Sequence, residues 1–161
     1  MAAKRSRPPG WLRAVNDGDG AALARLCAAD LALHAHDPLL PALPPGAAGL
    51  VRWVETLRTA FPDLTLTLEA ESGQGRTHVF TFRARGTHRG RLANLRPTGR
   101  PAAFVGRLML RHDQAERIAE VWLRTNLASL MPQLGMGPEL SPPAPTTAAR
   151  PKRAAHARAE R

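Results

Sequence analysis

The spacing of apolar residues changes near the middle of the chain. From residue 47 to residue 60 apolar side chains recur at helical spacing, at Leu50, Trp53, Val54 and Leu57, which predicts an amphipathic helix over this range. Two shorter helices are expected before it, one over residues 11–16 that ends at Gly18, and one that Asp19 caps and that runs through Cys27. The first part of the chain is therefore predicted to be mainly helical.

Alternation of apolar and polar residues predicts the strands. One short strand is expected after Asp30, in "LALHAHDP", which stops at Pro38 and enters a Pro-rich loop. From residue 64 the alternation continues through four segments, 64–71, 78–88, 102–111 and 117–126, and the last two are joined by the hairpin loop "HDQAE". Helices followed by an antiparallel meander predict an α+β fold, with the helices packed on one face of the sheet.

The net charge raises the question of a nucleic-acid partner, and its distribution argues against one. The chain has 161 residues and a formal charge of +10, of which residues 1–9 carry +3 and residues 141–161 carry +4. Both ends are rich in Pro and Ala and are expected to be disordered, without aromatic residues on which bases stack. We predict a basic tail over residues 1–9, one domain over 10–138 and a second tail over 139–161. Solvated tails are the simpler interpretation, and weak contact with nucleic acid or another acidic surface is the alternative.

The single cysteine and the hydropathy pattern bear on the compartment. Cys27 lies in the apolar pattern "LARLCAA", which favours a buried thiol over a reactive nucleophile, and it has no second cysteine to pair with. No stretch of 18 apolar residues predicts a membrane span, and no apolar run at the N-terminus predicts a secretory signal. A cytoplasmic protein is expected.

Four stretches, in order along the chain, resemble one family. They are "RAVNDGDGAALARLCAADLALHAHDP", "TAFPDLTLTLEA", the loop "GTHRGRLANLRPTGR", and "IAEVW" followed by "LASLMPQLG". Together they resemble the SnoaL-like polyketide cyclases of the nuclear-transport-factor-2-like superfamily. The resemblance implies a curved antiparallel sheet wrapped on N-terminal helices into a cone-shaped α+β barrel. It also implies a pocket in the mouth of the cone and a homo-oligomer built on the outer face of the sheet.

The resemblance further implies ring closure by intramolecular aldol condensation, without a metal or organic cofactor. That reaction needs a group that removes a proton beside a carbonyl and a group that protonates the new alkoxide. The resemblance implies that a histidine on the penultimate strand and an aspartate on the last strand have these two roles in the family. Here the two positions fall on Leu108 and Leu123, and neither side chain transfers protons.

The alternation of the last two strands gives an independent view of this alignment. If Leu108 and Leu123 point into the cone, the inward set also holds Phe104, Gly106, Leu110, Ala119 and Val121. The outward set is then Val105, Arg107, Met109, Arg111, Ile118, Glu120, Trp122 and Arg124. All the charged residues of these two strands then lie on the outer face of the sheet. A shift of the pattern by one residue would bury unpaired charges at a cost of several kcal/mol each. The inner wall is therefore predicted to be apolar, and Trp122 and Met109 are expected at an oligomer contact.

Proton transfer must then come from elsewhere, and the first strand offers the candidates His34, His36 and Asp37. The two histidines are expected to share a face, where Asp37 would orient an imidazole. The alternative is structural, because Asp before Pro also begins a turn. A metal site is not expected, because no second group of ligands completes a tetrahedron. His88, in the "GTH" loop, is expected to cap backbone groups or face solvent, with a catalytic base as the alternative.

The substrate pocket is predicted to be lined by Trp53, Phe80, Phe82, Phe104, Leu108 and Leu123, although Trp53 also fits a simple core position. The function favoured by the sequence is a protein of bacterial secondary metabolism that binds a polyketide-like, hydrophobic small molecule. It would cyclise or isomerise this ligand with His36 and either Asp37 or His34 in place of the usual pair. The alternative is a non-catalytic ligand-binding or accessory module that has lost the reaction.

Overall fold

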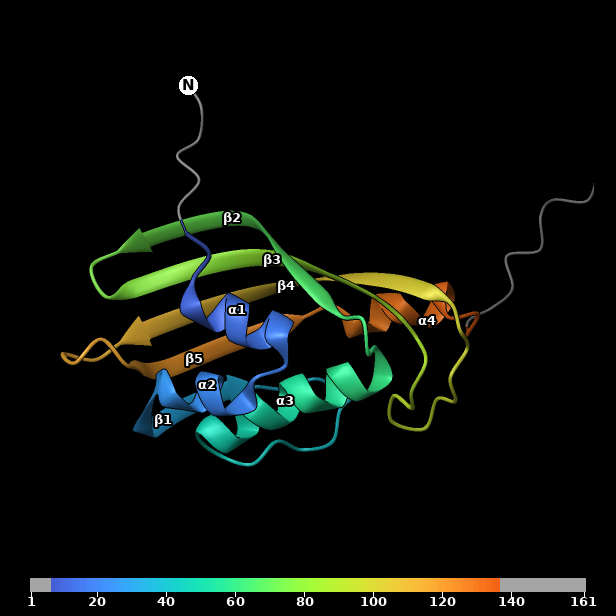
Figure 1. Cartoon of the computed structure of the whole chain (residues 1–161), viewed down its shortest axis with the longest axis horizontal. Helices are drawn as coiled ribbons and strands as arrows, with labels where there is room; N and C mark the ends of the chain where they lie inside the picture. Colours follow the sequence, from blue (N-terminus) through green and yellow to red (C-terminus); the bar gives the residue numbers. More distant parts are fainter. Residues whose placement is uncertain (1–6, 137–161) are drawn as a thin grey trace, which may run out of the picture.

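The computed structural model describes residues 7–136, which form helices and one sheet (Figure 1). The helices are α1 (Gly10–Asp17), α2 (Gly20–Arg25), α3 (Ala47–Ala60), the single 3₁₀ turn η1 (Leu127–Ser129) and α4 (Leu130–Gln133). The strands are β1 (Cys27–Ala35), β2 (Thr65–Gln74), β3 (Thr77–Thr87), β4 (Pro101–His112) and β5 (Ile118–Thr125). The predicted helix over residues 47–60 and the four later strands are confirmed to within a few residues at each end.

The five strands form one curved sheet in the order β1-β5-β4-β3-β2. The pairs from β2 to β5 are antiparallel, as predicted, whereas β1 runs parallel to β5. The sheet is therefore mixed, and the expectation of a purely antiparallel sheet is wrong at this edge. Short hairpin connections make β2 and β3, and likewise β4 and β5, antiparallel. β1 is far from β5 in the sequence, so no hairpin fixes its direction.

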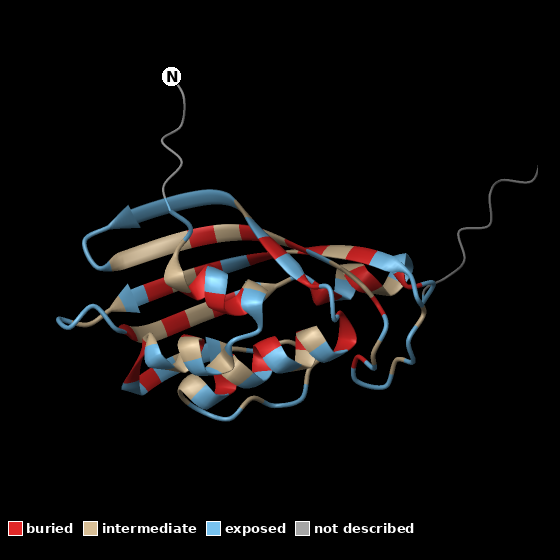
Figure 2. Ribbon diagram, in the orientation of Figure 1, coloured by how far each residue is buried: buried red, intermediate tan, exposed pale blue. Residues whose placement is uncertain are grey.

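The core lies between the sheet and the three N-terminal helices, which pack on the same side of it (Figure 1). Buried positions alternate along the strands that face these helices, as the banding in Figure 2 shows. Trp11 and Val15 of α1 and Trp53 and Leu57 of α3 are buried against the sheet. Periodicity of 3.6 residues in the helices and of two in the strands therefore brings the apolar faces together, as predicted.

The boundary between α2 and β1 differs from the prediction. The helix ends at Arg25 instead of running through Cys27, and β1 already begins at Cys27. The backbone N–H of Ile118 donates to the carbonyl of Leu26 at 2.8 Å, so pairing with β5 takes the chain out of the helix. Cys27 is buried as predicted, and burial raises the pKa of its thiol.

The register of the last two strands confirms most of the predicted faces. Leu108 pairs with Leu123, and both point into the core with 5% of their surface exposed. Ile118 is the exception, because it was assigned to the outer face and is 3% exposed in the core. The register shifts between Arg111 and His112, so that Ala119 has no partner on β4. This bulge reverses the alternation and turns Ile118 inward.

The loop of residues 88–100 is fastened to the end of α3. The backbone N–H groups of Arg89 and Gly90 donate to the carbonyl of Ala60, each at 3.0 Å. The His88 ring is fully buried, and its Nδ1 accepts a hydrogen bond from the backbone N–H of Thr98 at 3.3 Å. The predicted capping role is confirmed, whereas the predicted exposure to solvent is wrong. Burial lowers the pKa of His88, so the ring is held in its neutral form.

The tails fall largely outside the structure. Residues 1–6 and 137–161, which carry most of both predicted basic tails, lie outside the described residues. The domain limits at residues 10 and 138 therefore stay predictions. Among the described residues, no helix is long and apolar enough to cross a membrane.

Candidate functional site

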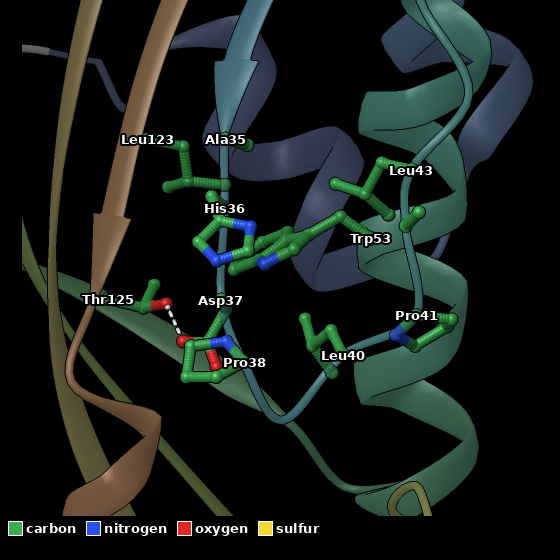
Figure 3. A pocket seen from close by; sticks show the side chains of 11 residues that line it. Ala35, His36, Asp37, Pro38, Leu40, Pro41, Leu43, Trp53, Leu123 and Thr125 are labelled. Atoms are coloured by element: carbon green, nitrogen blue, oxygen red, sulfur yellow. Dashed lines mark hydrogen bonds between the residues drawn. The ribbon is translucent and has the colours of Figure 1, made fainter.

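A pocket of about 190 Å³ opens where β1 ends, between β5, α3 and the loop of residues 37–43 (Figure 3). We call it the mouth pocket. Its lining consists of Ala35, His36, Asp37, Pro38, Leu40, Pro41, Ala42, Leu43, Trp53, Leu123 and Thr125. Only His36, Asp37 and Thr125 carry side chains whose polar groups act as acids, bases or alcohols, so the pocket is mainly apolar with a polar edge.

Asp37 fixes the turn that forms this edge. Its Oδ1 accepts a hydrogen bond from the backbone N–H of Leu39 at 2.9 Å, and its Oδ2 accepts one from the hydroxyl of Thr125 at 2.9 Å (Figure 3). The first bond is the local turn that Asp before Pro favours. The second ties the loop to β5. The predicted turn at Asp37 is thus observed, and both oxygens of Asp37 accept hydrogen bonds from groups other than an imidazole.

His36 is the titratable side chain left at the pocket edge. It follows the last residue of β1, lines the mouth pocket and is exposed to solvent. Within residues 7–136 its ring takes part in none of the side-chain hydrogen bonds. Its imidazole is therefore free to exchange protons with solvent or with a bound molecule.

His34 lies on the other face of the sheet, so the prediction that it shares a face with His36 is wrong. It pairs in register with Trp122 and stacks on that indole, with ring centroids 5.1 Å apart. Its Nε2 lies 2.9 Å from Oε1 of Glu120, which also accepts a hydrogen bond from Arg111. The hydrogen bonds from Arg111 and, to a lesser extent, from His34 lower the pKa of the Glu120 carboxyl group. His34 lies within β1, where alternation directs its side chain to the outer face. His36 follows the end of β1 at Ala35, so the alternation no longer determines its direction.

A second, inner cavity of about 20 Å³ lies deeper, between the sheet and the helices. It is lined by Trp11, Val15, Leu23, Leu50, Trp53, Leu66, Phe82, Leu108, Leu110, Ile118 and Leu123. Trp53 and Leu123 line both cavities, so they form the wall between them. Of the predicted pocket residues, Phe82 and Leu108 line the inner cavity, and Phe80 and Phe104 are buried but line neither.

Several lining residues were not predicted. Thr125 was missed although it follows Leu123 by two residues, a spacing that places both on the same face of a strand. Leu40 and Leu43 were missed because they lie in the Pro-rich loop, where no periodicity reveals which side chains point inward. Trp11 was predicted to lie in a short helix, and no function was assigned to its side chain.

Metal ligands do not gather in this region. Among the described residues, no three His, Cys, Asp or Glu side chains come together as a metal-binding group. His36 and Asp37 are neighbours in sequence, but Asp37 is turned toward Thr125, and His34 is on the opposite face. Within the described residues, the mouth pocket therefore offers a mainly apolar lining and one imidazole, that of His36.

Solved structures of several bacterial proteins share this fold. IdmH, a candidate polyketide cyclase of Streptomyces antibioticus, is 30% identical, with a TM-score of 0.68 over 79% of this chain and 94% of its own. AclR, a candidate hydroxylase of Streptomyces galilaeus, is 22% identical, with a TM-score of 0.69 over 81% of this chain and 83% of its own. A protein of Catenulispora acidiphila with a ketosteroid isomerase-like fold, solved with trimethylamine, is 20% identical, with a TM-score of 0.64 over 80% and 91%.

The likeness to AclR and to the Catenulispora protein shows the fold alone, whereas IdmH is also similar in sequence. No curated protein has a sequence that matches this chain. The sequence model of the SnoaL-like polyketide cyclases matches residues 10–134, which include every element of the structure. The chain therefore belongs to the SnoaL-like polyketide cyclase family.

Proposed function

We propose that this protein encloses a flat, largely apolar, polyketide-like molecule in the mouth pocket and cyclises or isomerises it with His36 as the proton-transferring group. One observation carries the proposal: the imidazole of His36 lines the mouth pocket, whose lining is mainly apolar, and within residues 7–136 this ring takes part in none of the side-chain hydrogen bonds. Membership of the family and the similarity to IdmH support a ligand from bacterial secondary metabolism. In this proposal the protein is cytoplasmic, and its reaction needs no metal or organic cofactor.

One imidazole is enough for the proton balance of an aldol closure. The neutral ring of His36 removes a proton from the carbon beside a carbonyl, and the resulting enolate attacks a second carbonyl of the same molecule. The new carbon–carbon bond leaves an alkoxide, which takes the proton back from the imidazolium. The same imidazole thus acts first as the base and then as the acid, and no second titratable group is needed.

The apolar wall supports the reaction by restricting the ligand. Leu40, Leu43 and Trp53 form one side of the mouth pocket, and Leu123 lies across from them on β5. A flexible chain held between these surfaces loses conformations that keep its reacting carbons apart. The pocket of about 190 Å³ is smaller than the range of about 300–1,000 Å³ that encloses drug-sized ligands. The ligand must therefore displace part of the lining or extend beyond the rim.

Asp37 and Thr125 position His36 rather than take part in proton transfer. Their hydrogen bond fixes the residue that follows His36 to the end of β5. Since both oxygens of Asp37 already accept hydrogen bonds, the carboxylate acts as an anchor for the turn. We expect its loss to let the imidazole move away from the pocket.

A second function is favoured by a different observation. The sequence resemblance assigns the two proton-transferring positions of the family to Leu108 and Leu123, and these residues lie opposite each other in register. A family member that had lost its reaction and kept its pocket would have such an inner wall. In that case the protein is a ligand-binding or accessory module, and His36 serves only to orient the ligand.

Turnover and binding measured together separate these functions. Wild type, His36→Gln and the matched control His34→Gln are compared for binding and for conversion of an aromatic polyketone that cyclises by aldol closure. If His36 transfers the proton, His36→Gln binds the compound but converts it roughly 100-fold more slowly, and His34→Gln equals wild type. Binding without conversion by wild type would establish the binding module. Equal conversion by all three proteins would show that His36 has no role.

A further inference from the structure

The indole N–H of Trp53 is a hydrogen-bond donor that the fold does not use. Trp53 is 4% exposed, and within residues 7–136 its Nε1–H takes part in none of the side-chain hydrogen bonds. Among these residues, the polar side-chain atoms that are fully enclosed without a partner are Trp11 Nε1 and His88 Nε2. The Trp53 nitrogen is not one of them, so part of its surface is open. In a side chain that is otherwise buried, this opening must belong to a cavity that Trp53 lines.

The open side of the Trp53 nitrogen is the mouth pocket. Trp53 lines both the mouth pocket and the inner cavity. The inner cavity presents apolar surface alone, so it is not the space onto which the N–H opens. Figure 3 shows the Trp53 side chain extending from α3 into the mouth pocket, toward His36 after the end of β1. The indole donor and the imidazole therefore belong to the same pocket.

Packing holds the indole ring in its position. Trp53 comes from α3, and Phe82 of β3 packs edge-on against it, with ring centroids 6.5 Å apart and an angle of 77° between the rings. Phe82 is fully buried and lies over Gly106 of β4, where any Cβ atom would overlap its ring. Gly106 thus makes room for Phe82, and Phe82 supports Trp53. The indole N–H is a donor whose direction is set before a ligand binds.

The proposed reaction creates an acceptor for this donor. When His36 removes a proton beside a carbonyl, the electron pair of the broken C–H bond moves toward the carbonyl oxygen, which becomes the charged oxygen of an enolate. A donor already in place stabilises such a charge without reorganisation. Among the polar side chains that line the pocket, Asp37 and Thr125 bond to each other, and His36 takes the proton. The Trp53 N–H is the donor that remains for the oxygen.

We propose that the Trp53 indole N–H binds the carbonyl oxygen of the ligand in the mouth pocket and stabilises the enolate that forms when His36 removes the proton. This inference rests on the proposed function and adds the group that receives the developing charge. Only the carbonyl end of the ligand has to enter the pocket, because its apolar body can lie along Leu40 and Leu43 and extend beyond the rim. The substrate class is a ketone with a hydrogen-bearing carbon beside its carbonyl.

The test follows the exchange of the methylene hydrogens of 2-tetralone in D₂O over a range of ketone concentrations. Wild type is compared with Trp53→Phe and with the matched control Trp122→Phe, whose indole stacks on His34 on the outer face of the sheet. Trp53→Phe should lower the rate at saturation roughly 10- to 100-fold, the worth of one hydrogen bond to a charged oxygen, with little change in KM. Trp122→Phe should equal wild type. An unchanged rate in Trp53→Phe, or a change confined to KM, overturns the inference and leaves proton abstraction by His36 intact.

Two further measurements separate the N–H from the shape of the side chain. A chain with 3-benzothienylalanine at position 53 keeps the bicyclic shape of the indole and has sulfur in place of the N–H, so it should be as slow as Trp53→Phe. A wild-type rate in this chain overturns the inference.

The last measurement needs no variant. The three tryptophans give three indole N–H resonances, and that of Trp53 should move downfield when 2-tetralone binds to wild type. A Trp53 resonance that stays in place while wild type accelerates the exchange overturns the inference alone. No acceleration by wild type would overturn both the inference and the proposed reaction.

Discussion

Leu108 of β4 and Leu123 of β5 lie directly opposite each other on the inner face of the sheet, and each is only 5% exposed. The sequence resemblance predicts that these positions correspond to the proton-transferring pair of the family. On that prediction the two side chains still meet across the strands, but neither can transfer a proton. Variants at these positions can therefore separate the contribution of the apolar pocket from that of an acid–base pair.

Introducing a polar pair at these positions should first lower the stability of the fold. The single change Leu123→Asp buries an unpaired carboxylate, and we expect a loss of about 3 kcal/mol in the free energy of unfolding. Adding Leu108→His supplies the partner across the sheet and should recover part of this loss. Urea denaturation of the single and double variants measures both effects. Equal stability of the two would mean that the side chains do not meet across β4 and β5.

The Asp37–Thr125 hydrogen bond gives a prediction about the loop. Thr125→Val removes the hydroxyl that donates to Asp37 Oδ2 and keeps the shape of the side chain. We expect a loss of about 1 kcal/mol of stability, with faster hydrogen exchange at the Leu39 amide, which Asp37 also holds. Thr67→Val, an exposed threonine on β2, is the control. Unchanged exchange at Leu39 would show that the loop keeps its conformation without the bond to β5.

Sequence patterns predicted those parts of the fold that local physics determines. The helix over residues 47–60 was found at its observed bounds, because its apolar stripe is long and uninterrupted. Ile118 was placed on the wrong face, because a bulge at Ala119 depends on pairing with β4 and leaves no mark in the alternation. The parallel direction of β1 was not predicted for a similar reason, because only its pairing with β5 in the folded chain determines that direction.

The candidate site was predicted in part. His36 and Asp37 were selected as titratable residues at the end of a strand, and the structure places both at the mouth pocket. His34 was selected with them by alternation, and the end of β1 separates the two histidines onto opposite sides. The burial of the Trp11 indole N–H without a partner among residues 7–136 could not be foreseen, because it is a property of the packed core and not of the sequence.

His88 makes the stability of the protein depend on pH. Burial lowers its pKa in the folded state, so the unfolded chain binds more protons and the free energy of unfolding decreases as the pH falls through the unfolded value of about 6.5. His88→Asn keeps an acceptor for the Thr98 N–H and removes the titration. Between pH 7.5 and pH 5 wild type should lose more stability than this variant in urea denaturation. The same pH dependence in both proteins would contradict a neutral, buried His88.

The outer face of the sheet is expected to form the oligomer contact that the sequence predicted. Met109 and Trp122 pair in register there and are half-buried in the single chain, with the Glu120–Arg111 ion pair beside them. Met109→Glu places a charge next to these apolar side chains, where a partner subunit would desolvate it. Light scattering should show a dimer for wild type and a monomer for the variant. A monomeric wild type would show that no partner subunit binds this face.

Proton abstraction by His36 can be measured without knowing the natural substrate. The exchange of the acidic methylene hydrogens of 2-tetralone, a bicyclic aromatic ketone, is followed in D₂O by proton NMR with wild type, His36→Gln and His34→Gln. If His36 abstracts the proton, wild type and His34→Gln accelerate the exchange equally, and His36→Gln accelerates it roughly 100-fold less. Exchange by His36→Gln at the wild-type rate, or no acceleration by wild type above buffer, would show that His36 does not abstract the proton.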